Sequence, residues 1–197
     1  MKRLTDIAFP LLLAALVLGG WEAAIAHWQV PQYVMPAPSA IARAFCANFT
    51  SLMESLFSTL SVTLQAFFAA CVLGVAAAIG FSQSRLLERT LYPYAVILQV
   101  TPVVAIAPLI LIWVGFEHIN LALVIIATIV AFFPILAGAT LGLKSADFNL
   151  LDLARLHGAS RLQILWRIRL PTALPYLLSG MKTAGGLALI GAVVAEF

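Results

Sequence analysis

The chain is 197 residues long, 63% hydrophobic and only 10% charged, with a mean hydropathy of +1.06. Soluble domains carry about 25% charged residues, and a soluble core of this length could not bury so much apolar surface. The formal net charge of +3 comes without a basic patch interleaved with aromatic residues, which argues against nucleic-acid binding. The composition therefore predicts a protein embedded in a lipid bilayer.

Five apolar runs are long enough to cross a hydrocarbon core as helices, which takes about 20 residues each. None of them shows the alternation expected of a membrane β-barrel, and a helix satisfies its own backbone hydrogen bonds in lipid. We therefore predict an all-α, polytopic bundle that forms a single transmembrane domain over residues 1–197. The predicted spans are residues 7–26, 60–81, 91–114, 119–143 and 173–195.

The first predicted span also resembles a secretory signal peptide. Lys2 and Arg3 precede its apolar run, and residues 24–26 read Ala-Ile-Ala, the form of a cleavage site. The run is long for a signal peptide, and Trp21 and Glu22 lie close to the cut. We expect an uncleaved span, with cleavage as the alternative; both leave the later spans in place.

A proline-rich stretch follows the first span and contains Pro31, Pro36 and Pro38. Proline followed by Ser39 favours the start of a helix. Apolar residues then recur at helical spacing as far as Phe49. This pattern predicts a short helix on the outer membrane surface.

The third predicted span is interrupted by Pro93, Pro102 and Pro108, and Gln99 and Thr101 precede the second proline. Proline at membrane depth removes a backbone hydrogen bond and tends to kink the helix. Kinked and partly polar helices often line cavities. Two interpretations stay open, a purely structural kink and a wall of a translocation route.

Spans two, four and five carry small residues four positions apart, which allow helix backbones to approach closely in lipid. The stripes could pack within one bundle or form the seam between two copies, and the sequence does not decide. They are Ala70-Gly74-Ala78, Gly138-Gly142 and Gly180-Ala184-Ala188-Ala192.

The loop between the fourth and fifth spans is polar and basic. Asn149 can cap a short helix that ends near His157, and Gly158 permits a turn. Ser160 can start a second helix that reaches about residue 169, and Pro171 is expected to end that helix. The loop is therefore predicted to form two short helices joined at a glycine.

Six residues of this loop match, without a gap, the form E-A-A, three residues, G, nine residues, I-x-L-P. They are Asp152, Ala154, Gly158, Ile168, Leu170 and Pro171. The departures are Asp152 in place of Glu and Leu153 in place of the first Ala. This signature is typical of the permease subunits of binding-protein-dependent ABC importers, which the chain resembles from about Pro36 onward.

Looser matches indicate a group within that family. They lie at residues 102–108, 132–135, 158–160 and 194–196. With these matches, the chain resembles the permeases that serve nitrate, sulfonates such as taurine, and pyrimidine precursors of thiamine. Permeases of this size usually continue to a sixth span, so we expect this chain to lack its last helix.

The resemblance implies a set of partners. Two copies would form the pore, an ABC ATPase subunit would dock on a cytoplasmic coupling loop at about residues 144–172, and a periplasmic binding protein would deliver a small polar solute. Ala154, Gly158 and Ala159 would enter the partner, and Arg155 and Arg161 would donate to acidic residues on it. The predicted coupling residues are Asp152, Ala154, Arg155, Gly158, Ala159, Arg161, Ile168, Leu170 and Pro171.

The alternative interpretation of this loop is a basic segment anchored at anionic lipid headgroups. It would explain Arg161, Arg167 and Arg169 equally well. The position-by-position match to the signature favours docking of the ATPase.

The distribution of lysine and arginine predicts the orientation. With a cytoplasmic N-terminus, nine of the eleven basic residues are cytoplasmic, whereas Arg43 is outside and Lys182 lies in the fifth span. We therefore predict a multi-pass protein of the bacterial inner membrane.

Several chemistries are excluded. Residues 138–145 resemble a nucleotide-binding loop but have three residues between the glycines where four are required, so ATP must be bound by a partner chain, and no cofactor is expected. No metal-ligand motif occurs, and no catalytic constellation is present. An ion-gradient-coupled carrier is the alternative function, but it would need carboxylates inside the spans, where only Glu22 and Glu196 come close.

Polar residues at membrane depth are costly and often functional. They identify five candidates for the translocation pathway, although the amine of Lys182 could instead extend to the inner interface. The candidates are Gln65, Gln99, Thr101, Pro102 and Lys182.

Overall fold

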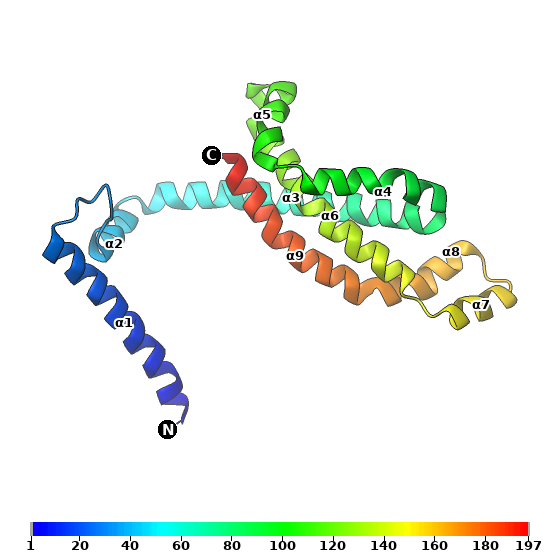
Figure 1. The fold of residues 1–197 in the computed structure, drawn as a ribbon, viewed down its shortest axis with the longest axis horizontal. Coiled ribbons are helices and arrows are strands. Elements are labelled where there is room, and N and C mark those ends of the chain that lie inside the picture. The colour runs from blue at the N-terminus through cyan, green and yellow to red at the C-terminus, as the bar shows by residue number, and fades with distance from the viewer. Residues whose placement is uncertain (1, 197) are drawn as a thin grey trace. The chain divides into compact units, whose positions relative to one another are not determined.

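The computed structural model describes residues 2–196, with side chains described from residue 8 onward. Every regular element in this range is helical (Figure 1), which confirms the predicted all-α fold class. The chain divides into two compact units, residues 1–56 and 57–197.

The first unit contains α1 (Lys2–Trp28) and α2 (Pro38–Ala47). The short helix predicted after the proline-rich stretch is confirmed, and Pro38 occupies its first turn, where a missing N–H group costs nothing. The carboxylate of Glu22 on α1 accepts hydrogen bonds from the Ser39 backbone N–H at 3.0 Å and from its hydroxyl at 2.7 Å. Glu22 therefore caps a helix that begins 16 residues later in the chain, a contact that no local pattern predicts.

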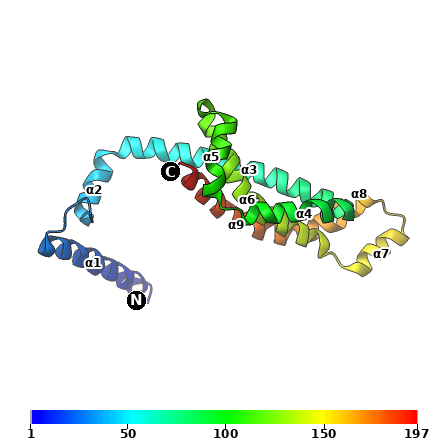
Figure 2. The ribbon, with the colours of Figure 1, turned by 45° about the horizontal axis from the view of Figure 1, so that its top comes forward.

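Three long helices form the core of the second unit. They are α3 (Phe49–Gln83), whose residues from 57 onward belong to this unit, α6 (Ile119–Lys144) and α9 (Leu170–Glu196). Figures 1 and 2 both show α6 and α9 running side by side. Each of these three helices is apolar and long enough to span a membrane, and so is the part of α1 over residues 8–28.

The small residues of the stripes lie at the contacts among these three helices. A Cβ atom built on Gly180 would lie 2.6 Å from the carbonyl oxygen of Pro134, and one on Gly142 would lie 2.8 Å from the Cα of Ala173. A Cβ on Gly74 would lie 2.9 Å from a side-chain methyl of Ile135. Of the two interpretations left open by the sequence, packing within the chain is therefore the one that the structure supports for these stripes.

The third predicted span consists of two helices, α4 (Arg85–Val100) and α5 (Val103–Val114), which are bent by 104° relative to each other. The break falls at Pro102, because the residue before a proline is driven out of the α conformation, and Thr101 is extended with ψ at 126°. Pro93 and Pro108 lie inside their helices without ending them. Both α4 and α5 pack against α6, and a single turn of 3-10 helix, η1 (Phe116–His118), leads from α5 into α6.

The loop after α6 contains α7 (Phe148–Leu156), α8 (Arg161–Ile164) and a π-helical turn, η2 (Leu165–Arg169). The first predicted short helix and the start of the second after Ser160 are confirmed, but the predicted cap of the first is wrong. Asp147, rather than Asn149, caps α7, and its carboxylate accepts a hydrogen bond from the Asn149 backbone N–H at 2.8 Å. Both residue types cap helices well, so the sequence alone could not choose between them.

The prediction that Pro171 ends the second helix is also wrong. Helix α8, the π turn and α9 form one continuous helical rod from Arg161 to Glu196. In the π turn the N–H of Leu170 donates to the carbonyl of Leu165, five residues back. This wider turn leaves room for the proline ring, which in a regular α-helix would clash with the carbonyl four residues back.

Candidate functional site

The helices α7 and α8 form a small hairpin, residues 147–164, with an apolar core of its own. Ala146, Leu151 and Ile164 are buried in this core. Ala154 and Ala159, which were expected to enter a partner, are half-buried and pack against it. These two alanines therefore support the hairpin more than they project from it.

The turn at the tip of the hairpin explains the spacing of the signature. The N–H of Ala159 donates to the carbonyl of Ala154 at 3.0 Å, and the N–H of Gly158 donates to the carbonyl of Arg155 at 2.9 Å. This is the Schellman pattern of hydrogen bonds, which ends a helix at a residue with positive φ and brings together two small apolar side chains. Gly158 has a φ of +72°, and a Cβ built on it would meet nothing within 4 Å. Glycine is therefore required here by the backbone conformation, and a steric clash plays no part.

A capping box begins the second arm of the hairpin, which confirms the prediction that a helix starts at Ser160. Its hydroxyl accepts a hydrogen bond from the backbone N–H of Gln163 at 3.3 Å, and the side-chain carbonyl of Gln163 accepts from the N–H of Ser160 at 2.7 Å. Two backbone N–H groups that would otherwise lack partners are thereby satisfied. The turn is fixed at both ends, by glycine before it and serine after it.

Large apolar side chains project from the hairpin into open space. Leu156 is 85% exposed, Leu153 and Leu162 are also exposed, and so is Trp166 in the adjoining π turn. Beside them lies a cavity of about 470 Å³ that the exposed Gly158 and the half-buried Ala159 help to line. Sequence reasoning missed these side chains, although Leu153 and Leu156 lie three positions apart and therefore share one face of α7.

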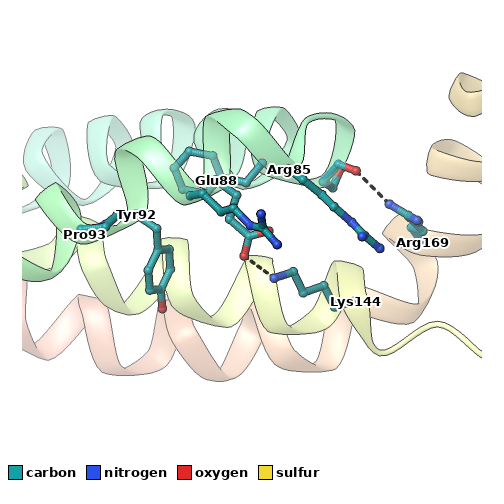
Figure 3. A pocket seen from close by; sticks show the side chains of 9 residues that line it. Arg85, Glu88, Tyr92, Pro93, Lys144 and Arg169 are labelled. Atoms are coloured by element: carbon teal, nitrogen blue, oxygen red, sulfur yellow. Dashed lines mark hydrogen bonds and ion pairs between the residues drawn. The ribbon is translucent and has the colours of Figure 1, made fainter.

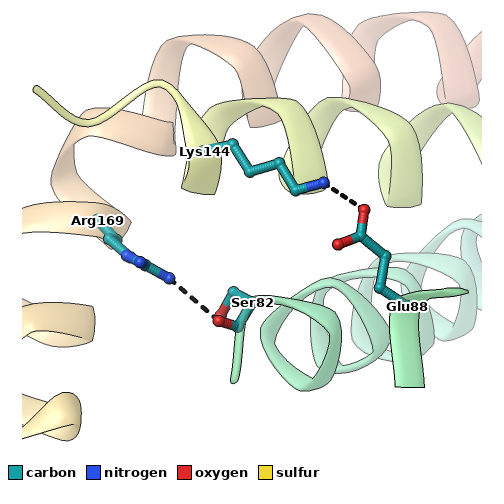
Figure 4. A network of polar contacts seen from close by, with 4 residues as sticks. All are labelled: Ser82, Glu88, Lys144 and Arg169. Atoms are coloured by element: carbon teal, nitrogen blue, oxygen red, sulfur yellow. Dashed lines mark hydrogen bonds and ion pairs between the residues drawn. The ribbon is translucent and has the colours of Figure 1, made fainter. Parts of the chain in front are cut away.

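The basic residues of the loop divide into two groups. Arg155 pairs with Asp152 at 2.8 Å on the exposed surface of α7. Arg169 instead reaches the end of α3, where its Nη1 donates to the carbonyl oxygen of Ser82 at 3.1 Å (Figure 4). An ion pair between Lys144 at the end of α6 and Glu88 on α4 lies close by (Figure 4). The π turn and the end of α6, on either side of the hairpin, are thus joined to the corner between α3 and α4.

The five pathway candidates do not form one cluster. Gln99, Thr101 and Pro102 come together only as neighbours at the bend between α4 and α5. Gln65 on α3 donates to the hydroxyl of Ser61 at 3.0 Å, and the hydroxyl of Thr101 donates to the carbonyl of Ile97 at 2.7 Å. Within residues 8–196, no hydrogen bond or ion pair joins two of the five, which are Gln65, Gln99, Thr101, Pro102 and Lys182.

The features of this site are an exposed apolar surface and a helical connection to α9. No group of three or more His, Cys, Asp or Glu side chains that could hold a metal ion occurs in the part of the chain that the structure describes. The exposed apolar hairpin is continuous with a membrane-spanning helix. This arrangement can bind a partner and transmit a displacement.

Comparison with known proteins gives the family. The sequence profile of the family described as "Binding-protein-dependent transport system inner membrane component" matches residues 70–197. A probable ABC transporter permease protein of Haemophilus influenzae is 32% identical over 95% of this chain and 76% of its own length. The riboflavin transport system permease protein RibX of Chloroflexus aurantiacus is 34% identical over 92% of this chain and 68% of its own length.

The formylaminopyrimidine transport permease protein ThiX of Halalkalibacterium halodurans is 31% identical over 100% of this chain and 78% of its own length. This relative confirms the predicted resemblance to permeases for pyrimidine precursors. The ion-gradient-coupled alternative is not favoured. The chain belongs to the inner membrane components of binding-protein-dependent transport systems, as the multi-pass translocation subunit of an ABC importer, in which a separate ATPase subunit hydrolyses ATP.

Proposed function

We propose that the hairpin of α7 and α8 is the surface on which the ATPase subunit docks. The observation that carries this proposal is that exposed leucines lie next to the turn at Gly158. Leu156 is 85% exposed next to a turn whose tip has no side chain. Exposed apolar side chains of this kind mark interaction sites, and a bare backbone lets a partner approach closely.

The coupling residues take different roles in this proposal. Leu153 and Leu156 are the apolar anchors, and Gly158 admits the partner. The ion pair of Asp152 and Arg155 lies at the rim, where it orients the partner more than it adds affinity. Ala154 and Ala159 keep the turn closed, and Arg161 is an exposed donor at the start of the second arm.

Movement would pass from the hairpin into the membrane through α9. Ile168, Leu170 and Pro171 lie at the π turn that joins α8 to α9 without a break. A displacement of the docked hairpin would therefore pull on a spanning helix directly. The π turn is the place where this rod can change register, because π bulges are less regular than the helix on either side.

We further propose that this end of the second unit faces the cytoplasm of a bacterium. The support is the accumulation of basic side chains there, as the positive-inside rule requires. Two cavities at this end are lined by arginines and a lysine from α4, α6 and the coupling loop. Lys2 and Arg3 at the start of the sequence independently favour a cytoplasmic N-terminus. In a chain whose native Cys46 and Cys71 are replaced by serine, expressed without the ATPase subunit, Leu156→Cys should react with a membrane-impermeant thiol reagent only in inside-out vesicles.

The translocation pathway would run past the bend between α4 and α5, between two copies of the chain. Because Pro102 has no N–H, the carbonyl of Leu98 loses its usual helical partner, and such carbonyls are tolerated at membrane depth where they line a cavity. Gln65, Gln99 and Lys182 are exposed in the single chain, as side chains facing a shared route would be. Gln99→Leu should reduce uptake while leaving docking of the ATPase intact.

The substrate would be a small polar organic solute delivered by a periplasmic binding protein. RibX and ThiX are named for riboflavin and formylaminopyrimidine, both nitrogen heterocycles. A polar heterocycle is therefore the first class to test. Uptake by the assembled importer should be competed by such compounds and not by sugars of similar size.

Two substitutions of Gly158 test the docking role against a purely conformational role. Asparagine tolerates positive φ, so Gly158→Asn keeps the turn but adds a side chain at the tip, whereas Gly158→Arg adds a larger one. Both variants should insert into the membrane and lose copurification of the coexpressed ATPase subunit. Normal copurification with Gly158→Asn would mean that only the turn matters.

A matched pair of leucines tests the anchors. Leu156→Ser should weaken binding of the ATPase roughly tenfold or more, since buried apolar anchors at interfaces are worth about 1–2 kcal/mol or more. The control is Leu86→Ser, which alters a similarly exposed leucine at the start of α4. Equal copurification from both variants would refute the docking surface.

A further inference from the structure

A second charged feature lies at the corner where α3 ends, α4 begins and α6 meets the coupling loop. A cavity of about 550 Å³ opens there, and four of its lining side chains are cationic (Figure 3). Arg85 and Arg89 come from α4, Lys144 from α6 and Arg169 from the π turn. Glu88 is the one carboxylate that lines it.

The carboxylate of Glu88 is already engaged, because it pairs with Lys144. Among the described residues Arg85 and Arg89 have no ion pair, and Arg169 binds only the carbonyl of Ser82. The Nε atom of Arg169 is buried without a hydrogen-bond partner. Three guanidinium groups thus line one cavity with unused donors and no carboxylate left to neutralise them.

Like charges around a shared space repel one another, although solvent weakens this repulsion at the exposed Arg85 and Arg89. A buried N–H donor without a partner also costs free energy. One anion with several acceptor oxygens would relieve both costs. Phosphate fits best, since the planar guanidinium fork donates two parallel hydrogen bonds to its oxygens. A single carboxylate has fewer acceptor oxygens to share among three arginines.

The position of the cavity also suits a phosphate at the membrane surface. It lies at the ends of the apolar helices α3 and α6, and its remaining wall includes Phe81, Tyr92 and Pro93. Aromatic rings are enriched where hydrocarbon meets headgroups, and basic pockets between spanning helices bind anionic headgroups. We propose that this cavity is a binding site for a phosphate group, as carried by an anionic phospholipid or by soluble phosphate.

Native mass spectrometry of the importer, purified with its ATPase subunits, tests the proposal. The probes are phosphatidylglycerol, phosphatidylcholine and inorganic pyrophosphate. Arg85→Gln/Arg89→Gln should bind the anionic probe that the wild type retains, phosphatidylglycerol or pyrophosphate, at least roughly tenfold more weakly, because it removes two guanidinium groups that can donate charge-assisted hydrogen bonds to phosphate. Glu88→Gln should bind it more tightly, and the control Arg43→Gln, which removes an exposed cation elsewhere in the chain, should match the wild type.

The two sources are separated by competition. Retained phosphatidylglycerol that millimolar pyrophosphate does not displace assigns a lipid headgroup, and binding of pyrophosphate alone assigns a soluble phosphate. Equal retention of phosphatidylglycerol and pyrophosphate by the wild type and the double arginine variant would overturn the proposal. So would loss of the ATPase subunits from the double variant with unchanged retention, because the arginines would then serve a protein contact.

Discussion

The contact between α6 and α9 and the hairpin of α7 and α8 both depend on glycine, but for opposite reasons. Between the long helices, glycine is needed for space, since a Cβ on Gly180 would lie 2.6 Å from the carbonyl oxygen of Pro134. At the hairpin tip, Gly158 has empty space around it and is needed for its φ of +72°. Glycine is thus required by close packing in one region and by backbone conformation in the other.

This difference extends to stability. The packed helices α3, α6 and α9 share several clusters of buried residues along their length. The hairpin depends on one small core around Leu151 and Ile164, and on its turn hydrogen bonds. Elements with few buried contacts open at low free energy. The element proposed to dock the ATPase is therefore the softer of the two, although it continues into a packed spanning helix.

The largest expected effect comes from filling the space between the long helices. In Gly180→Val, branched atoms would enter a contact that cannot hold even one methyl group, and overpacking of this kind costs about 1–3 kcal/mol or more. The purified variant should melt well below the wild type in detergent, as followed by loss of the monodisperse peak after heating.

The matched control is Gly186→Ala on the same helix. A Cβ at this exposed position meets nothing within 4 Å, and alanine favours the helix over glycine. Its melting temperature should equal or exceed that of the wild type. If both variants melted alike, close approach at Gly180 would not be what holds the two helices together.

These two regions also differ in how far the sequence could predict them. The hairpin depends on local rules, so Gly158 and Ser160 could be identified as a turn and a helix start. The stripes could be found by their spacing, but their partner could not, because small residues specify close approach without specifying to what. Nor could local rules predict the contact of Arg169 with Ser82, which lies 87 positions away in the chain.

A middle-sized effect is expected at the hairpin. Ser160→Ala removes the hydroxyl of the capping box, and losing such a cap costs about 1 kcal/mol. Amide hydrogens of residues 160–164 should exchange roughly fivefold faster, because about 1 kcal/mol changes an opening equilibrium by that factor. Exchange in α6 and α9 should stay as in the wild type.

The serine control for this experiment lies on α9. Ser179 is exposed, and Ser179→Ala removes a hydroxyl without removing a cap. It should leave exchange in the hairpin unchanged. Faster exchange throughout the second unit in Ser160→Ala would contradict the separation between a soft hairpin and a packed core.

The smallest effect is expected at the corner between α4 and α6, where the packed helices meet the start of the coupling loop. The ion pair of Lys144 and Glu88 joins the end of α6 to α4, and the side chain of Lys144 is 51% exposed. A pair so open to solvent is worth about 0–1 kcal/mol. In a double-mutant cycle of Lys144→Gln and Glu88→Gln, the coupling energy from thermal unfolding should lie in that range and shrink with added salt. A larger, salt-independent coupling would mean that this corner is part of the packed core, and the boundary between the rigid and the soft region would then move to the π turn.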